Sequence, residues 1–225
     1  MLGRLAIGLA TPGYESICAR PLPLSDNQLD PPSEGQTGET PWHGNTTTYI
    51  PGLNRLCDLF GVWHEIQSAP PSRDPTESID RYLGMVQQVI DNLPPELRWR
   101  GGLSRPPGAT KGHDVQIANL LVTSLHLRSN ILQKFGTPGD YGAEHQRIVD
   151  DLLEVLYHMP QAVFEANGPS LVPKIRDIGA AYLDQFREES GASQVGSQGG
   201  RQRLERLLSR LDDLDYWHGL SLADT

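Results

Sequence analysis

The acidic segment Asp150-Asp151-Leu152-Leu153-Glu154 is the strongest candidate for chemistry in this sequence. The spacing of apolar residues places it in a helix predicted over residues 142–159. Asp150, Asp151 and Glu154 then lie within about one helical turn, where carboxylates can share a hard cation such as Mg²⁺. A magnesium site is one hypothesis for this segment, and a solvated helix face is the other.

The apolar positions of the same helix favour the solvated face. If Ile148 and Leu152 face the core, the three carboxylates point largely toward solvent. The segment resembles the metal-binding cluster of class I terpene synthases, which also need Asn, Ser and Glu one turn apart on another helix. Asn119 is followed at those offsets by Thr123 and Leu127, so that second motif is missing. We also expect a solvated face for Asp212, Asp213 and Asp215.

The histidines and cysteines do not form a recognisable metal or catalytic pattern. Trp63-His64-Glu65 resembles the start of a zinc-protease helix, but Ser68 stands where the second histidine belongs. Cys57 and His64 lie two turns apart, yet zinc needs two further ligands, which favours core packing. The other histidines are scattered: His43, His113, His126, His145, His158 and His218. The sequence therefore assigns no catalytic, cofactor-binding, metal-binding or DNA-binding residue and indicates a protein that is not an enzyme.

Composition narrows the possible partners. The 225 residues carry 19 Lys and Arg against 28 Asp and Glu, a net charge of −9, which argues against a surface that grips nucleic acid. The basic loop residues are therefore expected to be solvated: Arg98, Arg100, Arg105 and Lys111. The mean hydropathy is −0.42, and no apolar run approaches the roughly 20 residues of a membrane span.

The N-terminus and the cysteines indicate an intracellular fragment. Cys18 and Cys57 cannot build a disulfide framework and are interpreted as reduced thiols. The apolar part of residues 1–10 is too short for a signal peptide. We interpret it as the end of a helix that begins outside this chain.

Apolar periodicity predicts an all-α fold, an irregular multi-helix bundle with long Pro/Gly-rich loops. In the first helix, the predicted inward residues are Leu53, Leu56, Cys57, Phe60 and Trp63, with Ile66 as a further candidate. The second begins with an N-cap at Asp74 followed by Pro75. The helices are predicted over residues 53–66, 75–93, 114–135, 142–159, 170–189 and 201–217.

The same pattern predicts the domain organisation. Residues 1–50 are predicted to be an irregular segment that packs on the body through Leu22, Leu24 and Leu29. A helical portion follows over 51–189, then a flexible linker over 190–200 and a C-terminal helix with a tail over 201–225. Leucines at a and d positions of the last helix predict that it docks on the body or on a partner.

Several segments, in chain order, carry a family resemblance: Ala19–Asp26 with Leu29-Asp30, Asn92–Trp99, Gln116–Leu132 and Leu204–Trp217. The first is similar to a Gly-Arg-Pro segment with an acidic tail, although Ala19 replaces the glycine. The second is similar to a Leu-Pro-x-x-Leu turn, the third to a long buried helix before a basic-Pro segment (approximately 135–138 here), and the last to a helix closing in Trp. The chain thus resembles the C-terminal part of the central regulatory domain, or middle homology region, of fungal zinc-cluster transcription factors.

The resemblance implies a nuclear, regulatory role. Family members bind DNA through a six-cysteine zinc cluster, which Cys18 and Cys57 alone cannot form. We therefore expect a regulatory, non-DNA-contacting portion of an RNA polymerase II transcription factor, acting through protein or effector contacts. The alternatives are a magnesium-dependent terpene-synthase-like fragment and a stand-alone helical adaptor. Apolar faces that lack N-terminal partners are expected to be partly exposed, which predicts a protein partner or self-association.

Overall fold

The computed structural model describes residues 48–70, 74–101, 108–137, 141–190 and 197–223. Contacts divide the chain into two units, Met1–Ile50 and Pro51–Thr225, and the helices below belong to the second from Pro51 onward. Residues 1–47 of the predicted irregular segment, with Cys18 and the Gly-Arg-Pro-like motif, lie outside the described residues. Its last residue, Ile50, already begins α2.

The described residues confirm an all-α, multi-helix fold with no strand among them. Two short 3₁₀ turns, Pro95–Leu97 and Gly168–Ser170, interrupt the connections. None of the described helices combines the length and apolarity needed to cross a bilayer. The α-helices are α2 (Ile50–Ser68), α3 (Pro75–Asp91), α4 (Lys111–Phe135), α5 (Gly142–His158), α6 (Gln161–Asn167), α7 (Val172–Ser190) and α8 (Ser197–Ala223).

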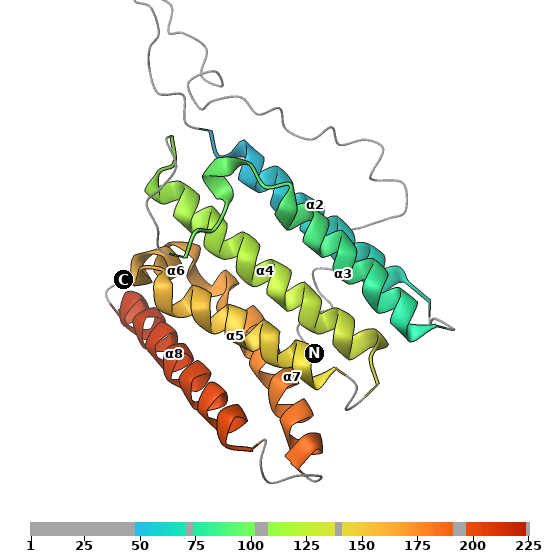
Figure 1. Ribbon diagram of the computed structural model, residues 1–225. Helices are drawn as coiled ribbons and strands as arrows, with labels where there is room; N and C mark the ends of the chain where they lie inside the picture. The colour runs from blue at the N-terminus through green and yellow to red at the C-terminus, as the bar shows by residue number, and fades with distance from the viewer. Residues whose placement is uncertain (1–47, 71–73, 102–107, 138–140, 191–196, 224–225) are drawn as a thin grey trace, which may run out of the picture. The chain divides into compact units, whose positions relative to one another are not determined.

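Helix α4 is the centre of the bundle. It contacts α3 on one side and α5, α6 and α7 on the other, and Figure 1 shows it running between these two groups. Its buried apolar residues therefore surround most of the helix, as a helix packed on several sides requires. They are Ile117, Ala118, Leu120, Val122, Leu125, Leu127, Ile131, Leu132 and Phe135.

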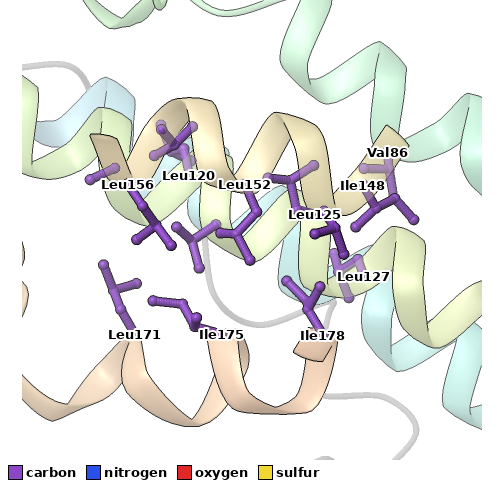
Figure 2. Packing of buried hydrophobic residues seen from close by; sticks show 14 of the residues in the cluster. Val86, Leu120, Leu125, Leu127, Ile148, Leu152, Leu156, Leu171, Ile175 and Ile178 are labelled. Atoms are coloured by element: carbon purple, nitrogen blue, oxygen red, sulfur yellow. The ribbon is translucent and has the colours of Figure 1, made fainter. Parts of the chain in front are cut away.

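Helices α5 and α7 supply the second half of the core. Figure 2 shows Leu171, Ile175 and Ile178, at the start of and along α7, pointing toward the α5 residues Leu152 and Leu156. All five are at most 1% exposed, and full burial of each such side chain contributes roughly 1.5–3 kcal/mol. The α5 periodicity used to predict this helix is thereby confirmed.

Helix α8 docks on the body, as the sequence predicts. It contacts α5 and α7, and Leu207, Leu211 and Leu214 are buried in the common core. Arg203 binds Asp150 of α5 through two hydrogen bonds of 2.7 and 2.9 Å. These contacts join the C-terminal helix to the bundle.

The beginning of α3 confirms the predicted cap. The Asp74 carboxylate accepts a hydrogen bond of 3.1 Å from the Glu77 backbone N–H, and Pro75 is the first helical residue. Proline suits this position because its missing N–H would have no helical partner there.

The predicted inward face of α2 is wrong in part. Leu53, Cys57 and Phe60 are exposed, and Gly52, Leu59 and Val62 are buried in their place. Ile66, the further candidate, is buried as predicted. Apolar residues occur all round α2, so periodicity alone did not select the face that α3 and α4 cover. Leu56 and Trp63, also predicted inward, are partly buried against the core.

Two helix starts differ from the prediction, and one short helix was not predicted. Helix α4 starts at Lys111 instead of Asp114, because the Thr110 backbone N–H donates to His113 Nδ1 over 3.0 Å and caps the first turn. Helix α8 starts at Ser197, within the predicted linker, because Arg203 anchors its first turns to α5 despite two glycines. The short helix α6 follows Pro160 and was not predicted, since seven residues carry little periodicity.

Helix α2 ends against a lysine of α4. The Lys134 ammonium donates to the backbone carbonyls of Ile66, Gln67 and Ala69. The last carbonyls of a helix have no partner within it, and a cation there is favourable. Lys134 therefore fixes where the end of α2 lies on α4.

Gly136 follows the last residue of α4, and close contacts explain why this position is a glycine. Its φ of −76° and ψ of 155° are extended, so left-handed freedom is not the reason for glycine. A Cβ there would collide with the Leu132 carbonyl oxygen and lie 2.9 Å from the Tyr141 ring. Close packing of the α4 end on Tyr141 requires this glycine.

We expect Gly136→Ala to lower the free energy of unfolding by about 1–3 kcal/mol, the usual cost of overpacking. Gly84 is the matched control, because it lies exposed in α3 and a Cβ there would have no atom within 4 Å. Gly84→Ala should raise the same free energy by about 0.5–1 kcal/mol. Urea denaturation measures both, and equal effects of the two substitutions would contradict the contact argument.

Candidate functional site

A polar stripe runs along α4 through an otherwise apolar helix. Asn119, Thr123, His126 and Asn130 recur at alternating spacings of four and three residues and so share one face. Helix α7 packs along this face and contributes Lys174 and Asp177. We call these six residues the polar seam.

Lys174 forms one end of the polar seam. Its ammonium donates to Thr123 Oγ1 over 2.8 Å and to Asn119 Oδ1 over 3.4 Å. The Thr123 hydroxyl in turn donates to Asn119 Oδ1 over 3.1 Å. The ammonium also lies 6.0 Å from the centre of the Phe60 ring on α2. Lys174 therefore links α7 to α4 and α2, and its partners among the described residues include no carboxylate.

His126 and Asp177 form the middle of the polar seam. His126 Nε2 lies 3.1 Å from Asp177 Oδ2, and because a carboxylate only accepts, Nε2 carries the proton that it donates. The Asn130 carboxamide nitrogen lies 3.3 Å from the same Nε2. This pair joins α4 to α7 through one hydrogen bond.

Burial sets the charge state of the polar seam. Desolvation lowers the pKa of His126, Asp177 opposes that shift through charge and hydrogen bonding, and Lys174 adds to it. Desolvation likewise lowers the pKa of Lys174. His126 is therefore mainly neutral at pH 7, because its pKa lies below the ordinary value of 6.5.

A cavity of about 370 Å³ opens at the other end of the polar seam. Its walls come from the end of α4, the connection into α5, the start of α5 and the middle of α7. The lining residues are Asn130, Leu132, Gln133, Gly136, Thr137, Tyr141, His145, Asp177, Ala180, Ala181, Asp184 and Gln185. The volume lies at the lower end of the range that small-molecule sites occupy.

The lining of the cavity suits a ligand that makes hydrogen bonds. It offers two carboxylates, three carboxamides, the hydroxyls of Thr137 and Tyr141, and the His145 imidazole. Among the described residues no lysine or arginine lines it. Because carboxylates repel anions, the lining favours neutral or cationic ligands.

The carboxylates of the predicted magnesium segment lie on the solvent side of α5, as the alternative hypothesis predicts. Asp150, Asp151 and Glu154 are all exposed. Asp150 binds Arg203 of α8, and Asp151 accepts from Arg128 of α4 over 3.1 Å. The arginines draw the two aspartates to different helices, so this geometry gives the magnesium hypothesis no support.

The other candidates are also separated. Cys57 is exposed and His64 partly buried, which corrects the expectation of core packing for Cys57. Glu65 pairs with Arg81 of α3. Of the residues predicted in the basic loop, Arg100 is exposed and Arg98 donates to the Leu93 carbonyl over 2.8 Å. Lys111 is exposed as the first residue of α4, and Arg105 lies outside the described residues.

Within the described part of the chain, no group of three or more His, Cys, Asp or Glu side chains is close enough to hold a metal ion. Sequence reasoning missed the polar seam because it interpreted α4 only through its apolar residues. The signal of the seam is the run of Asn119, Thr123, His126 and Asn130 at helical spacing, continued by Gln133, inside the most buried helix.

No family model matches the chain, and neither the curated proteins nor the solved structures include a match. The resemblance to fungal zinc-cluster regulators therefore remains a prediction from the sequence motifs.

We expect His126 to make stability depend on pH. The pKa of His126 is lowered below 6.5 in the folded chain, so the unfolded chain binds more protons. The free energy of unfolding therefore falls as the pH drops from 6.5 toward the folded pKa. His126→Gln removes this titration. Denaturation at pH 7.5 and pH 5 should show a smaller loss of unfolding free energy for the variant. If the variant and the wild type lose the same unfolding free energy between pH 7.5 and pH 5, the role of His126 is contradicted.

Proposed function

We propose that this chain is the regulatory, non-DNA-contacting portion of a fungal-type RNA polymerase II transcription factor, and that it responds to a small polar effector. The order of motifs in the sequence supports the family. The cavity at the end of the polar seam is the observation that carries the effector proposal. Nuclear localisation follows from the family proposal alone.

The position of the cavity supports regulation through packing. Its walls belong to α4, α5 and α7, so a bound ligand contacts three helices at once. Helix α8 packs on two of these, α5 and α7. A ligand that binds one arrangement of the three helices more tightly shifts the population toward it, and α8 follows. Such a mechanism needs contact and no chemical step.

The first test compares the binding of small polar ligands that differ in charge. Putrescine, myo-inositol and succinate serve as cationic, neutral and anionic probes, and thermal unfolding reports binding to the folded chain. We expect putrescine to raise the melting temperature most and succinate not to raise it, because Asp177 and Asp184 line the cavity. Stabilisation by succinate alone would contradict the proposed ligand class.

A variant that fills the cavity shows whether putrescine binds there, and a matched variant outside the cavity is its control. Ala180 lines the cavity and is exposed, so Ala180→Trp should occupy the space without disturbing the core. Ala143 is exposed on α5 and is not part of the lining. The putrescine response should disappear in Ala180→Trp and persist in Ala143→Trp; a response retained by both variants would place the ligand elsewhere.

The second test measures transcription. The chain is fused to a heterologous DNA-binding domain and expressed in yeast with a matching reporter gene. We expect reporter output to differ from that of the DNA-binding domain alone, and Ala180→Trp, but not Ala143→Trp, to shift it. A fusion that reaches the nucleus and leaves the reporter unchanged would contradict the regulatory proposal.

A further inference from the structure

The exposed face of α2 carries an apolar stripe. Leu53, Cys57 and Phe60 recur at spacings of four and three residues and so lie on one side of the helix. Leu53 is 48% exposed and Phe60 47%. We call these three residues the α2 stripe. It spans roughly 10 Å, which matches about two turns of a second helix.

A cation lies beside the α2 stripe. The Lys174 ammonium is 6.0 Å from the Phe60 ring centre, and its hydrogen bonds go to Thr123 and Asn119, which are both neutral. No carboxylate of the described residues forms an ion pair with it. An ammonium has three donors, so one remains for a partner.

The charged residues of α2 itself are already paired. Arg55 binds Asp58 over 3.0 Å on the same helix, and Glu65 binds Arg81 of α3. On α7, Asp177 accepts a hydrogen bond from His126, which is mainly neutral, so the negative charge of Asp177 is not cancelled there. Of the charges described here, it is the Lys174 ammonium that lies against a residue of the α2 stripe.

Gly61 leaves room next to Phe60. It is exposed, and a Cβ there would have no atom within 4 Å. A helix can approach another more closely over a glycine than over a larger side chain. A partner at this surface would thus meet the apolar α2 stripe, the positive charge of Lys174 and open space over Gly61.

We propose that the α2 stripe docks an acidic amphipathic helix of a partner protein. Apolar side chains of that helix cover Leu53 and Phe60, and one of its carboxylates pairs with Lys174. Charge complementarity selects this occupant, because a basic helix places a like charge against the Lys174 ammonium. The docking surface and the effector cavity are separate sites, because the cavity lining includes neither α2 nor Lys174.

The test uses two synthetic peptides of about 15 residues with leucines on one helical face. One carries glutamates beside the leucines and its twin carries lysines at the same positions. Fluorescence anisotropy measures binding to the full chain. We expect the acidic peptide to bind at least about tenfold more tightly than the basic twin. Equal binding of the two, or no binding of the acidic peptide, overturns the proposal.

Matched variants locate the site. Gly61→Gln should weaken acidic-peptide binding about tenfold, whereas Gly84→Gln, at an equally open and exposed glycine of α3, should not change it. Both glycines are helical and open, so both variants are expected to fold. Phe60→Ser should also weaken binding, and Leu208→Ser, at a 52% exposed leucine of α8, should not. Loss of binding in the control variants overturns the location.

The charge is tested separately. Lys174→Gln keeps a donor for Thr123 and removes the charge, so we expect acidic-peptide binding to weaken several-fold while the basic twin gains. Lys174→Arg should retain binding of the acidic peptide. In a Cys18→Ser background, bound acidic peptide should also slow alkylation of Cys57. If light scattering instead shows a dimer that Gly61→Gln dissociates, the occupant is a second copy and the proposal is wrong.

Discussion

The burial of α4 between α3 and the α5–α6–α7 group is the constraint on which the rest of this structure depends. A helix packed on several sides holds its polar residues buried or half-buried, so they are satisfied in part by partners within the bundle. Lys174 and Asp177 of α7 supply those partners for Thr123 and His126. The same requirement fixes how α7 is rotated against α4. Core packing and the polar seam are therefore two consequences of one arrangement.

The acidic residues of α5 have a structural role in this arrangement. Asp150 holds α8 through Arg203, and Asp151 holds α4 through Arg128. Glu144 adds a second contact to Arg128 at 2.7 Å. Exposed ion pairs contribute little energy individually, roughly 0–1 kcal/mol each. Their value is directional, because they select the register at which helices already driven together by apolar burial meet.

Lys174 connects the two surfaces for which we propose ligands. It ends the polar seam that leads to the cavity, and it lies beside Phe60 of the α2 stripe. Desolvation lowers its pKa, so a carboxylate arriving at the α2 stripe favours its charged form. The same charge acts on His126, whose pKa Lys174 lowers. A protein partner at α2 and an effector in the cavity thus act on neighbouring members of one polar network.

Local sequence signals predicted what local interactions control. The Asp74 cap, the periodicity of α5 and the solvent-facing carboxylates of Asp150 and Asp151 depend on residues within a few turns, and the structure confirms them. By contrast, the inward face predicted for α2 was wrong in part, because apolar residues surround that helix and its packing on α3 and α4 decides which are covered. The start of α8 depends on the distant pairing of Arg203 with Asp150.

By itself, then, the sequence determined an all-α chain, most of its helix positions and its solvated acidic faces, since the 3.6-residue period and capping chemistry are encoded locally. Only the tertiary structure decided that α4 and α7 meet along polar residues, that a cavity forms at their end, and that Leu53 and Phe60 stay exposed. Those outcomes depend on the rotation of each helix about its axis, which contacts between segments far apart in the chain determine.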